Sequence, residues 1–242
     1  MRMSMRRPPG NKLGPHHSSI SVDRFLSDAA RSKLPAARST HRLIFALDAT
    51  GSRQPTWDLA CELHAELFSE AARLGNIAIQ LCYYRGLSEF VASAWTTTPT
   101  SLRAHMSAVS CRAGRTQIGP LLEHAAREAA QYPVRALVFI GDCFEEDAKD
   151  VMRLAGQLAI RSLPVIIFQE GGERAATRLF RSIADITHGA HVPFDGNSPE
   201  ELRRLLGAVA QYTIGGHEAL ESYSQRIGNS QTQALLNQLG PS

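Results

Sequence analysis

The feature that most constrains the fold is a series of short apolar runs, separated by longer amphipathic stretches, that begins near residue 41. Short and almost wholly apolar runs are typical of strands buried on both faces of a sheet, and amphipathic stretches between them are typical of crossover helices. The candidate strands are residues 43–47, 77–83, 90–95, 136–140, 164–168 and 191–194. The pattern predicts an α/β fold with a mostly parallel sheet.

Four stretches between these runs have helical spacing: residues 56–74, 145–161, 175–186 and 199–211. In the first, Ala60, Leu63 and Leu67 fall on one face, and Thr56 is a candidate N-cap. Only six residues separate 77–83 from 90–95, too few for a crossover helix, so this pair should form an antiparallel hairpin. We therefore expect a doubly wound, three-layer α/β/α sandwich, Rossmann-like, with one antiparallel edge strand.

The two ends of the chain differ in composition from the middle. Residues 1–40 are rich in Arg, Pro, Gly and Ser and lack a hydrophobic period, which predicts a flexible basic arm. Most of the excess behind the net charge of +3 lies there. Residues 215–242 are polar and rich in Gln and Ser, so we expect a tail. The predicted organisation is an arm (1–40), one domain (41–214) and a tail (215–242).

Composition narrows the class of protein. A hydrophobic content of 43% suffices for a core, yet no apolar run approaches the roughly 20 residues that span a bilayer, so no membrane association is expected. The four cysteines form no CxxC pair, which favours free thiols in a reducing compartment and a cytoplasmic location. Only 7% of residues are aromatic, and basic and aromatic residues do not interleave, so specific nucleic-acid recognition is not expected.

Oxygen-bearing side chains gather where predicted strands end. The segment LIFALDATGS, residues 43–52, ends a strand at Asp48 and then presents Thr50 and Ser52. VFIGD ends another strand at Asp142, and Thr116 lies on a loop before a helical pattern. Because loops at the carboxyl ends of parallel strands share one edge of a sheet, these residues should lie close together. Oxygen ligands suit a hard divalent cation.

These motifs resemble those of the von Willebrand factor type A (VWA) family, specifically its members with a metal-ion-dependent adhesion site. DATGS, GRTQIG and IGD occur in the family's order, and the resemblance covers residues 42–214. It implies that Thr50, Ser52 and Thr116 provide hydroxyl ligands for Mg²⁺ or Mn²⁺. It also implies that Asp48 and Asp142 act directly or through water. An open coordination position would then bind an acidic residue of a protein partner.

The sequence also departs from the family pattern. Many members have Gly after the last aspartate, whereas DCFEED occurs here, and its acids Glu145, Glu146 and Asp147 either cap the next helix or tune the metal. Arg53, Arg112 and Arg115 flank the ligand loops. They are either solvated surface residues or receptors for an acidic or phosphorylated ligand.

Local alternatives remain open for the same residues. Asp48, Thr50 and Ser52 could form a turn that satisfies only its own backbone. Cys111 and Cys143 border the ligand loops, but no base accompanies them, so we interpret both as packing residues.

The resemblance favours a cytoplasmic, bacterial interaction module that serves as a scaffold or adaptor of a multi-protein or ATPase-linked complex. One alternative is a metal-dependent phosphohydrolase, although no second carboxylate lies two residues after Asp48 and the nearest lysine is Lys149. The other is a structural domain whose site binds no metal. We expect a protein that is not an enzyme, and the oligomeric state is left open.

Overall fold

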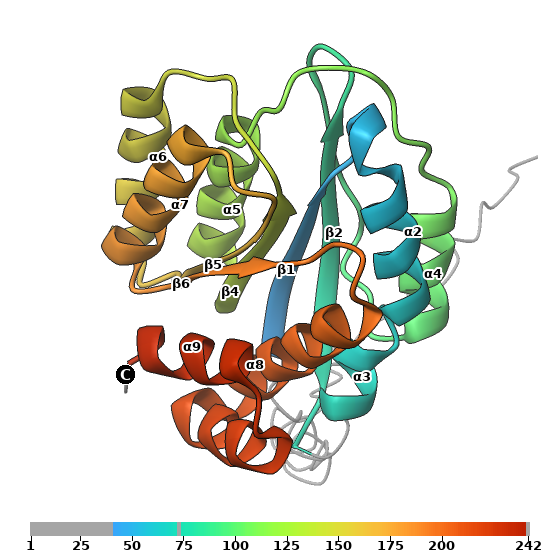
Figure 1. Ribbon diagram of the computed structural model, residues 1–242, viewed down its shortest axis with the longest axis vertical. Coiled ribbons are helices and arrows are strands. Elements are labelled where there is room, and N and C mark those ends of the chain that lie inside the picture. Colours follow the sequence, from blue (N-terminus) through green and yellow to red (C-terminus); the bar gives the residue numbers. More distant parts are fainter. Residues whose placement is uncertain (1–40, 72–73, 241–242) are drawn as a thin grey trace, which may run out of the picture. The chain divides into compact units, whose positions relative to one another are not determined.

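The computed structural model describes residues 41–71 and 74–240 (Figure 1). Its centre is a six-stranded sheet in the order β3-β2-β1-β4-β5-β6. The strands are β1 (His41–Asp48), β2 (Ile77–Arg85), β3 (Glu89–Ala92), β4 (Val134–Gly141), β5 (Val165–Glu170) and β6 (Ala190–Phe194). All neighbouring pairs are parallel except β2 and β3. The predicted fold class, including its antiparallel edge strand, is confirmed.

Helices cover both faces of the sheet (Figure 1). They are α2 (Gln54–Leu63), α3 (Glu66–Ala71), α4 (Pro99–Ser107), α5 (Gly119–Gln131), α6 (Ala148–Ile160), α7 (Arg174–Thr187), α8 (Pro199–Ile227) and α9 (Ser230–Gln238), and the 3₁₀ turn η1 (Gly51–Arg53) precedes α2. Side chains of α2, α3, α4, α8 and α9 share one hydrophobic cluster, and those of α5, α6 and α7 share the other.

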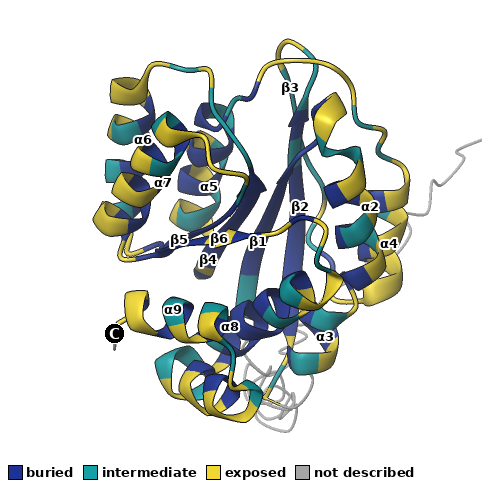
Figure 2. Cartoon of the chain, in the orientation of Figure 1, coloured by how far each residue is buried: buried dark blue, intermediate teal, exposed yellow. Residues whose placement is uncertain are grey.

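Strand β1 shows why the apolar runs are continuous. Leu43, Phe45 and Leu47 belong to the first cluster, whereas Ile44 and Ala46 belong to the second. Successive side chains of a strand point to opposite faces, so a strand covered on both sides needs apolar residues throughout. The buried centre of the sheet between its two helical layers is visible in Figure 2.

Helices on the first face differ in detail from the sequence-based expectation. The stretch 56–74 does not form one helix, because α2 ends at Leu63 and α3 begins at Glu66. Thr56 is not the N-cap: Arg53 occupies that position, and the Thr56 hydroxyl donates to Glu170. Helix α4, whose N-cap Thr98 accepts from Ser101 N–H, was not predicted.

The expected polar tail after residue 214 is wrong. Helix α8 extends to Ile227 as two helical segments that meet at a kink at Gly216 (φ 65°, ψ −153°), and α9 follows. Leu220 and Leu235 are fully buried in the first cluster. The Gln and Ser residues that suggested a tail belong largely to the outer faces of these helices. The predicted arm, 1–40, lies outside the described residues.

Among the described residues, no helix combines the length and apolar character needed to cross a membrane.

Candidate metal centre

The candidate site lies at the point in the sheet where the order of the strands reverses. Strand β1 pairs with β2 on one side and with β4 on the other, so the chain builds the sheet outward in both directions from β1. Asp48 is the last residue of β1, and Asp142 follows Gly141, the last residue of β4. In open α/β sheets this switch point, beyond the carboxyl ends of the strands, is where ligands bind.

Asp48 is a buried carboxylate with one engaged oxygen. Its side chain Oδ1 accepts from the Thr50 backbone N–H at 2.7 Å, whereas Oδ2 is buried and has no hydrogen-bond partner. Burial raises the pKa of Asp48, and the Thr50 hydrogen bonds oppose that shift. The hydroxyl of Tyr84, its register partner on β2, is buried close to the Asp48 carboxylate without a hydrogen bond of standard geometry; burial, and then the Asp48 charge, raise the pKa of this phenol well above its usual value.

Asp142 resembles Asp48 in having one unpaired oxygen. Its Oδ1 is buried without a hydrogen-bond partner, while Oδ2 lies 3.3 Å from Arg53 Nη2. The charge of Asp142 contributes to the raised pKa of Asp48, so the two carboxylates are close enough to repel each other. Two unpaired carboxylate oxygens therefore lie at the ends of adjacent strands.

Thr116 is brought to the same edge by contacts with the loop after β4. Its hydroxyl lies 3.4 Å from Cys143 Sγ, next to Asp142. Its backbone N–H donates to Glu145 Oε2 at 3.0 Å, and the Glu145 N–H donates to Thr116 O at 3.2 Å. This reciprocal pair fixes Thr116 beside the end of β4.

The three acids after Asp142 have different roles. Asp147 caps α6 by accepting from Lys149 N–H at 2.7 Å. Glu146 accepts from Gly119 N–H at the start of α5, at 2.9 and 3.1 Å. Only Asp147 therefore fits the predicted capping of the following helix, while Glu145 and Glu146 attach the Thr116 loop and α5 to the end of β4.

The two hydroxyls of the DATGS loop lie in different surroundings. Thr50 is buried, forms an isolated bridge with Arg112, and hydrogen-bonds to Asp48. Ser52 is exposed on η1, and its hydroxyl accepts from Arg53 Nε at 3.4 Å. The structure thus groups Asp48, Thr50, Thr116 and Asp142, with Ser52 at the rim of the same loop.

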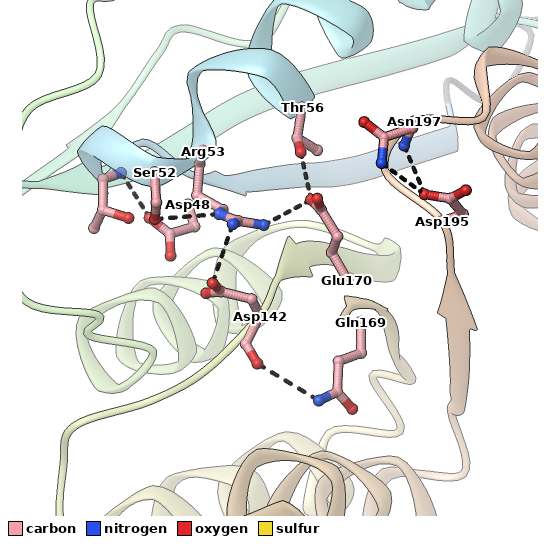
Figure 3. A network of polar contacts seen from close by, with 10 residues as sticks. Asp48, Ser52, Arg53, Thr56, Asp142, Gln169, Glu170, Asp195 and Asn197 are labelled. Carbon is pink, nitrogen blue, oxygen red and sulfur yellow. Dashed lines mark hydrogen bonds and ion pairs between the residues drawn. The ribbon is translucent and has the colours of Figure 1, made fainter. Parts of the chain in front are cut away.

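Sequence analysis names Arg53 only as one of three arginines that flank the ligand loops, and the structure places it within the site. Its side chain is only 15% exposed, and its guanidinium lies between Asp142 and Glu170, with Nη1 2.7 Å from Glu170 Oε2 (Figure 3). Thr56 donates to the same carboxylate oxygen of Glu170. Arg112 and Arg115 are exposed, as the surface interpretation expects.

A pocket of about 530 Å³ opens beside this network. Arg53, Asp142, Glu170, Asp195 and Glu201 are among the residues that line it. Asp195 Oδ1 accepts from the Asn197 backbone and side chain (Figure 3), and Glu201 accepts from Asp195 N–H. The pocket is therefore acidic apart from Arg53.

The thiols near the site are poorly suited to nucleophilic chemistry. Burial raises the pKa of both Cys111 and Cys143 to about 11, so both are protonated at neutral pH. The Cys143 thiol contacts Thr116, as a packing residue would.

The donor set fits a hard divalent cation. Unpaired, buried oxygens of Asp48 and Asp142 lie at one edge of the sheet with the hydroxyls of Thr50 and Thr116. Within the described residues, no three His, Cys, Asp or Glu side chains gather closely enough to hold a metal, so a cation here would need the hydroxyl oxygens as well. Such a set suits Mg²⁺, which accepts oxygen ligands and retains water.

Comparison with known proteins supports the fold at low sequence identity. No family model and no curated protein matches the sequence. Among solved structures, the chain is similar to an aerotolerance-related membrane protein from Bacteroides fragilis (TM-score 0.52, 18% identity, 70% of this chain and 98% of that one). It is also similar to the VWA domain of SpRpn10 (TM-score 0.54, 13% identity, 69% of this chain and 95% of that one).

A third similar structure is the human COPII-coat protein Sec24c, with a TM-score of 0.54 and 13% identity over 74% of this chain and 33% of that one. At these identities the likeness concerns the fold alone. Together with the strand order and the antiparallel edge strand, it leads to one conclusion: the chain has the fold of a VWA domain.

Proposed function

We propose that the chain is a protein-interaction module that binds Mg²⁺ or Mn²⁺ through five residues and uses the bound cation to hold an acidic residue of a protein partner. The five residues are Asp48, Thr50, Ser52, Thr116 and Asp142. The observation that carries the proposal is the pair of buried, unpaired carboxylate oxygens of Asp48 and Asp142 at the switch point of the sheet. A buried polar atom without a partner is costly, which favours a ligand there.

The charges at the site explain why the partner would be acidic. Two carboxylates balance a divalent cation formally, but Asp142 already shares its charge with Arg53, and the other donors are neutral hydroxyls. When bound, the cation would supply a Lewis-acidic position at the protein surface that accepts one further oxygen ligand. An acidic side chain supplies that oxygen together with the missing negative charge.

We propose binding rather than catalysis as the role of this site. The raised pKa values of Cys111 and Cys143 argue against a thiolate nucleophile, and Lys149 is exposed on α6. Sec24c, which shares the fold, is a COPII-coat protein. A phosphohydrolase would need a general acid, and no carboxylate follows Asp48 at the second position.

We further propose a cytoplasmic, bacterial setting in which the module is a scaffold or adaptor of a multi-protein or ATPase-linked complex. The four free cysteines are compatible with a reducing compartment.

The test is a calorimetric titration of the full chain with Mg²⁺ and Mn²⁺, alone and with millimolar acetate as a minimal acidic ligand. We expect the wild type to bind about one ion, more tightly with acetate. The double variant Asp48→Ala, Thr116→Ala should bind none. Asp150→Ala, which removes an exposed carboxylate on α6, should bind as the wild type does.

Absence of binding by the wild type under all these conditions would refute the metal-dependent module and favour a structural domain. Metal-dependent hydrolysis of phosphoesters that is lost in Asp48→Asn would favour the enzyme instead.

A further inference from the structure

We propose that Arg53 lowers the metal affinity of the site: its guanidinium pairs with one carboxylate oxygen of Asp142, and its positive charge opposes a cation at the other oxygen. This inference rests on the proposed function and concerns the regulation of the same site.

The geometry places a fixed positive charge on a predicted ligand. Arg53 directly follows Ser52, and its Nη2 lies 3.3 Å from Asp142 Oδ2. Its Nε also donates to the Ser52 hydroxyl at 3.4 Å. Arg53 thus contacts two of the five predicted ligand residues, and Figure 3 shows its guanidinium directed toward Asp142.

The position of Arg53 is stabilised from the other side. Glu170 pairs with Nη1 at 2.7 Å, and the Thr56 hydroxyl holds the same oxygen of Glu170. With its side chain only 15% exposed, Arg53 is shielded from water, so these pairs are screened less than surface ion pairs. Arg53 is therefore held in the site by two ion pairs, unlike a solvated surface arginine.

The pocket next to Arg53 offers its guanidinium an alternative position. Arg53 lines the pocket of about 530 Å³, and Asp195 and Glu201 line the same pocket. If Arg53 leaves Asp142, it can keep Glu170 and turn toward these acids without losing all compensation for its charge. Metal binding would then exchange one ion pair for another.

Charge repulsion determines how strongly Arg53 affects the metal affinity of the site. The guanidinium and a cation at the other oxygen of Asp142 carry like charges, and the partly buried site screens their repulsion less than bulk water would. Part of this repulsion is relieved when Arg53 moves toward the pocket. We therefore expect removal of the Arg53 charge to tighten metal binding by about tenfold or more.

The test is calorimetric titration with Mn²⁺ of the full-length wild type and three variants: Arg53→Gln, Arg53→Lys and Arg226→Gln. Arg226 is a matched control, because it forms a 3.0 Å ion pair with Glu70 that does not involve the site. Arg53→Gln should bind Mn²⁺ about tenfold or more tightly than the wild type. Arg53→Lys keeps the charge and should lie nearer to the wild type, and Arg226→Gln should equal it.

The outcomes separate this inference from the proposed function. If wild type and Arg53→Gln bind Mn²⁺ equally, the metal site stands and the inference about Arg53 is refuted. If Arg53→Gln alone binds, the inference about Arg53 is supported in its strongest form. If neither binds, with or without acetate, both proposals fail.

A second measurement needs no variant. In the ¹⁵N spectrum of the wild type, the Arg53 Nε–H signal should shift as Mg²⁺ saturates the site, while that of Arg226 should not. Saturation without any change at Arg53 would overturn the inference even if Arg53→Gln fails to fold.

Discussion

The buried side chain of His191 should make the stability of the protein depend on pH, and the size of this effect can be tested. The side chain lies on β6, is 4% exposed, and its Nε2 is 2.7 Å from Gln169 Oε1. Burial, aided by the Arg181 charge and opposed by Asp185, lowers the pKa of His191 to about 4. With Nε2–H donating to Gln169, the folded protein therefore holds a neutral imidazole at neutral pH.

The direction in which stability changes with pH follows from proton binding. Between about pH 6.5 and pH 4 the unfolded chain binds a proton at His191 and the folded chain does not, so stability falls as the pH is lowered through this range. The pKa of His191 is near 6.5 in the unfolded chain and about 4 in the folded protein. The free energy of unfolding should therefore fall by about 2.5 kcal/mol between about pH 7.5 and pH 4.5. Below pH 4 the loss should level off.

The assay is urea denaturation at several pH values for the wild type and His191→Gln, which can keep a donor to Gln169 but does not titrate. Burial raises the pKa values of Asp48 and Glu146, so these two acids make the folded protein more stable as the pH is lowered. Both proteins contain them, so the difference in free energy of unfolding between wild type and His191→Gln isolates the contribution of His191. That difference should change by about 2.5 kcal/mol between about pH 7.5 and pH 4.5. A constant difference between wild type and His191→Gln would refute the reasoning.

Three further predictions concern the C-terminal helices and the loops of the site. Leu235→Ala should lower the free energy of unfolding by roughly 2–5 kcal/mol because it opens a cavity under α9, whereas Ile160→Ala, at an exposed position, should change it by less than about 0.5 kcal/mol in urea denaturation. Glu145→Ala should weaken Mn²⁺ binding in calorimetry because it releases the Thr116 backbone, and unchanged affinity would contradict that role. Gly114→Ala should lower the melting temperature, since its Cβ would overlap the Gly86 backbone at the hairpin tip.

The parts of the site that could be predicted from sequence are those that depend on local pattern. Asp48 and Asp142 each end an apolar run, and parallel strands place such ends at one edge, so their proximity follows once the strands are assigned. The position of Thr116 before a helical pattern, together with the family resemblance, predicts its place at the same edge.

The parts that could not be predicted depend on contacts between distant residues. Arg53 meets Glu170 across more than one hundred positions of sequence, and nothing local distinguishes it from Arg112 or Arg115. Glu145 holds Thr116 across twenty-nine positions, although its place beside Asp147 suggested a helix cap. The apolar residues of α9 were too sparse to outweigh the polar composition around them, yet tertiary packing decides their burial.

Strand β5 contributes none of the predicted ligands, yet it ties the site to both helical layers. Successive residues of a strand face opposite sides, and here Glu170 reaches Thr56 on α2 while Gln169 reaches Thr177 on α7. Gln169 also donates to the Asp142 carbonyl at 3.5 Å, and Glu170 holds the arginine that pairs with the Asp142 carboxylate. The backbone and the side chain of Asp142 are thus positioned from opposite faces of the sheet.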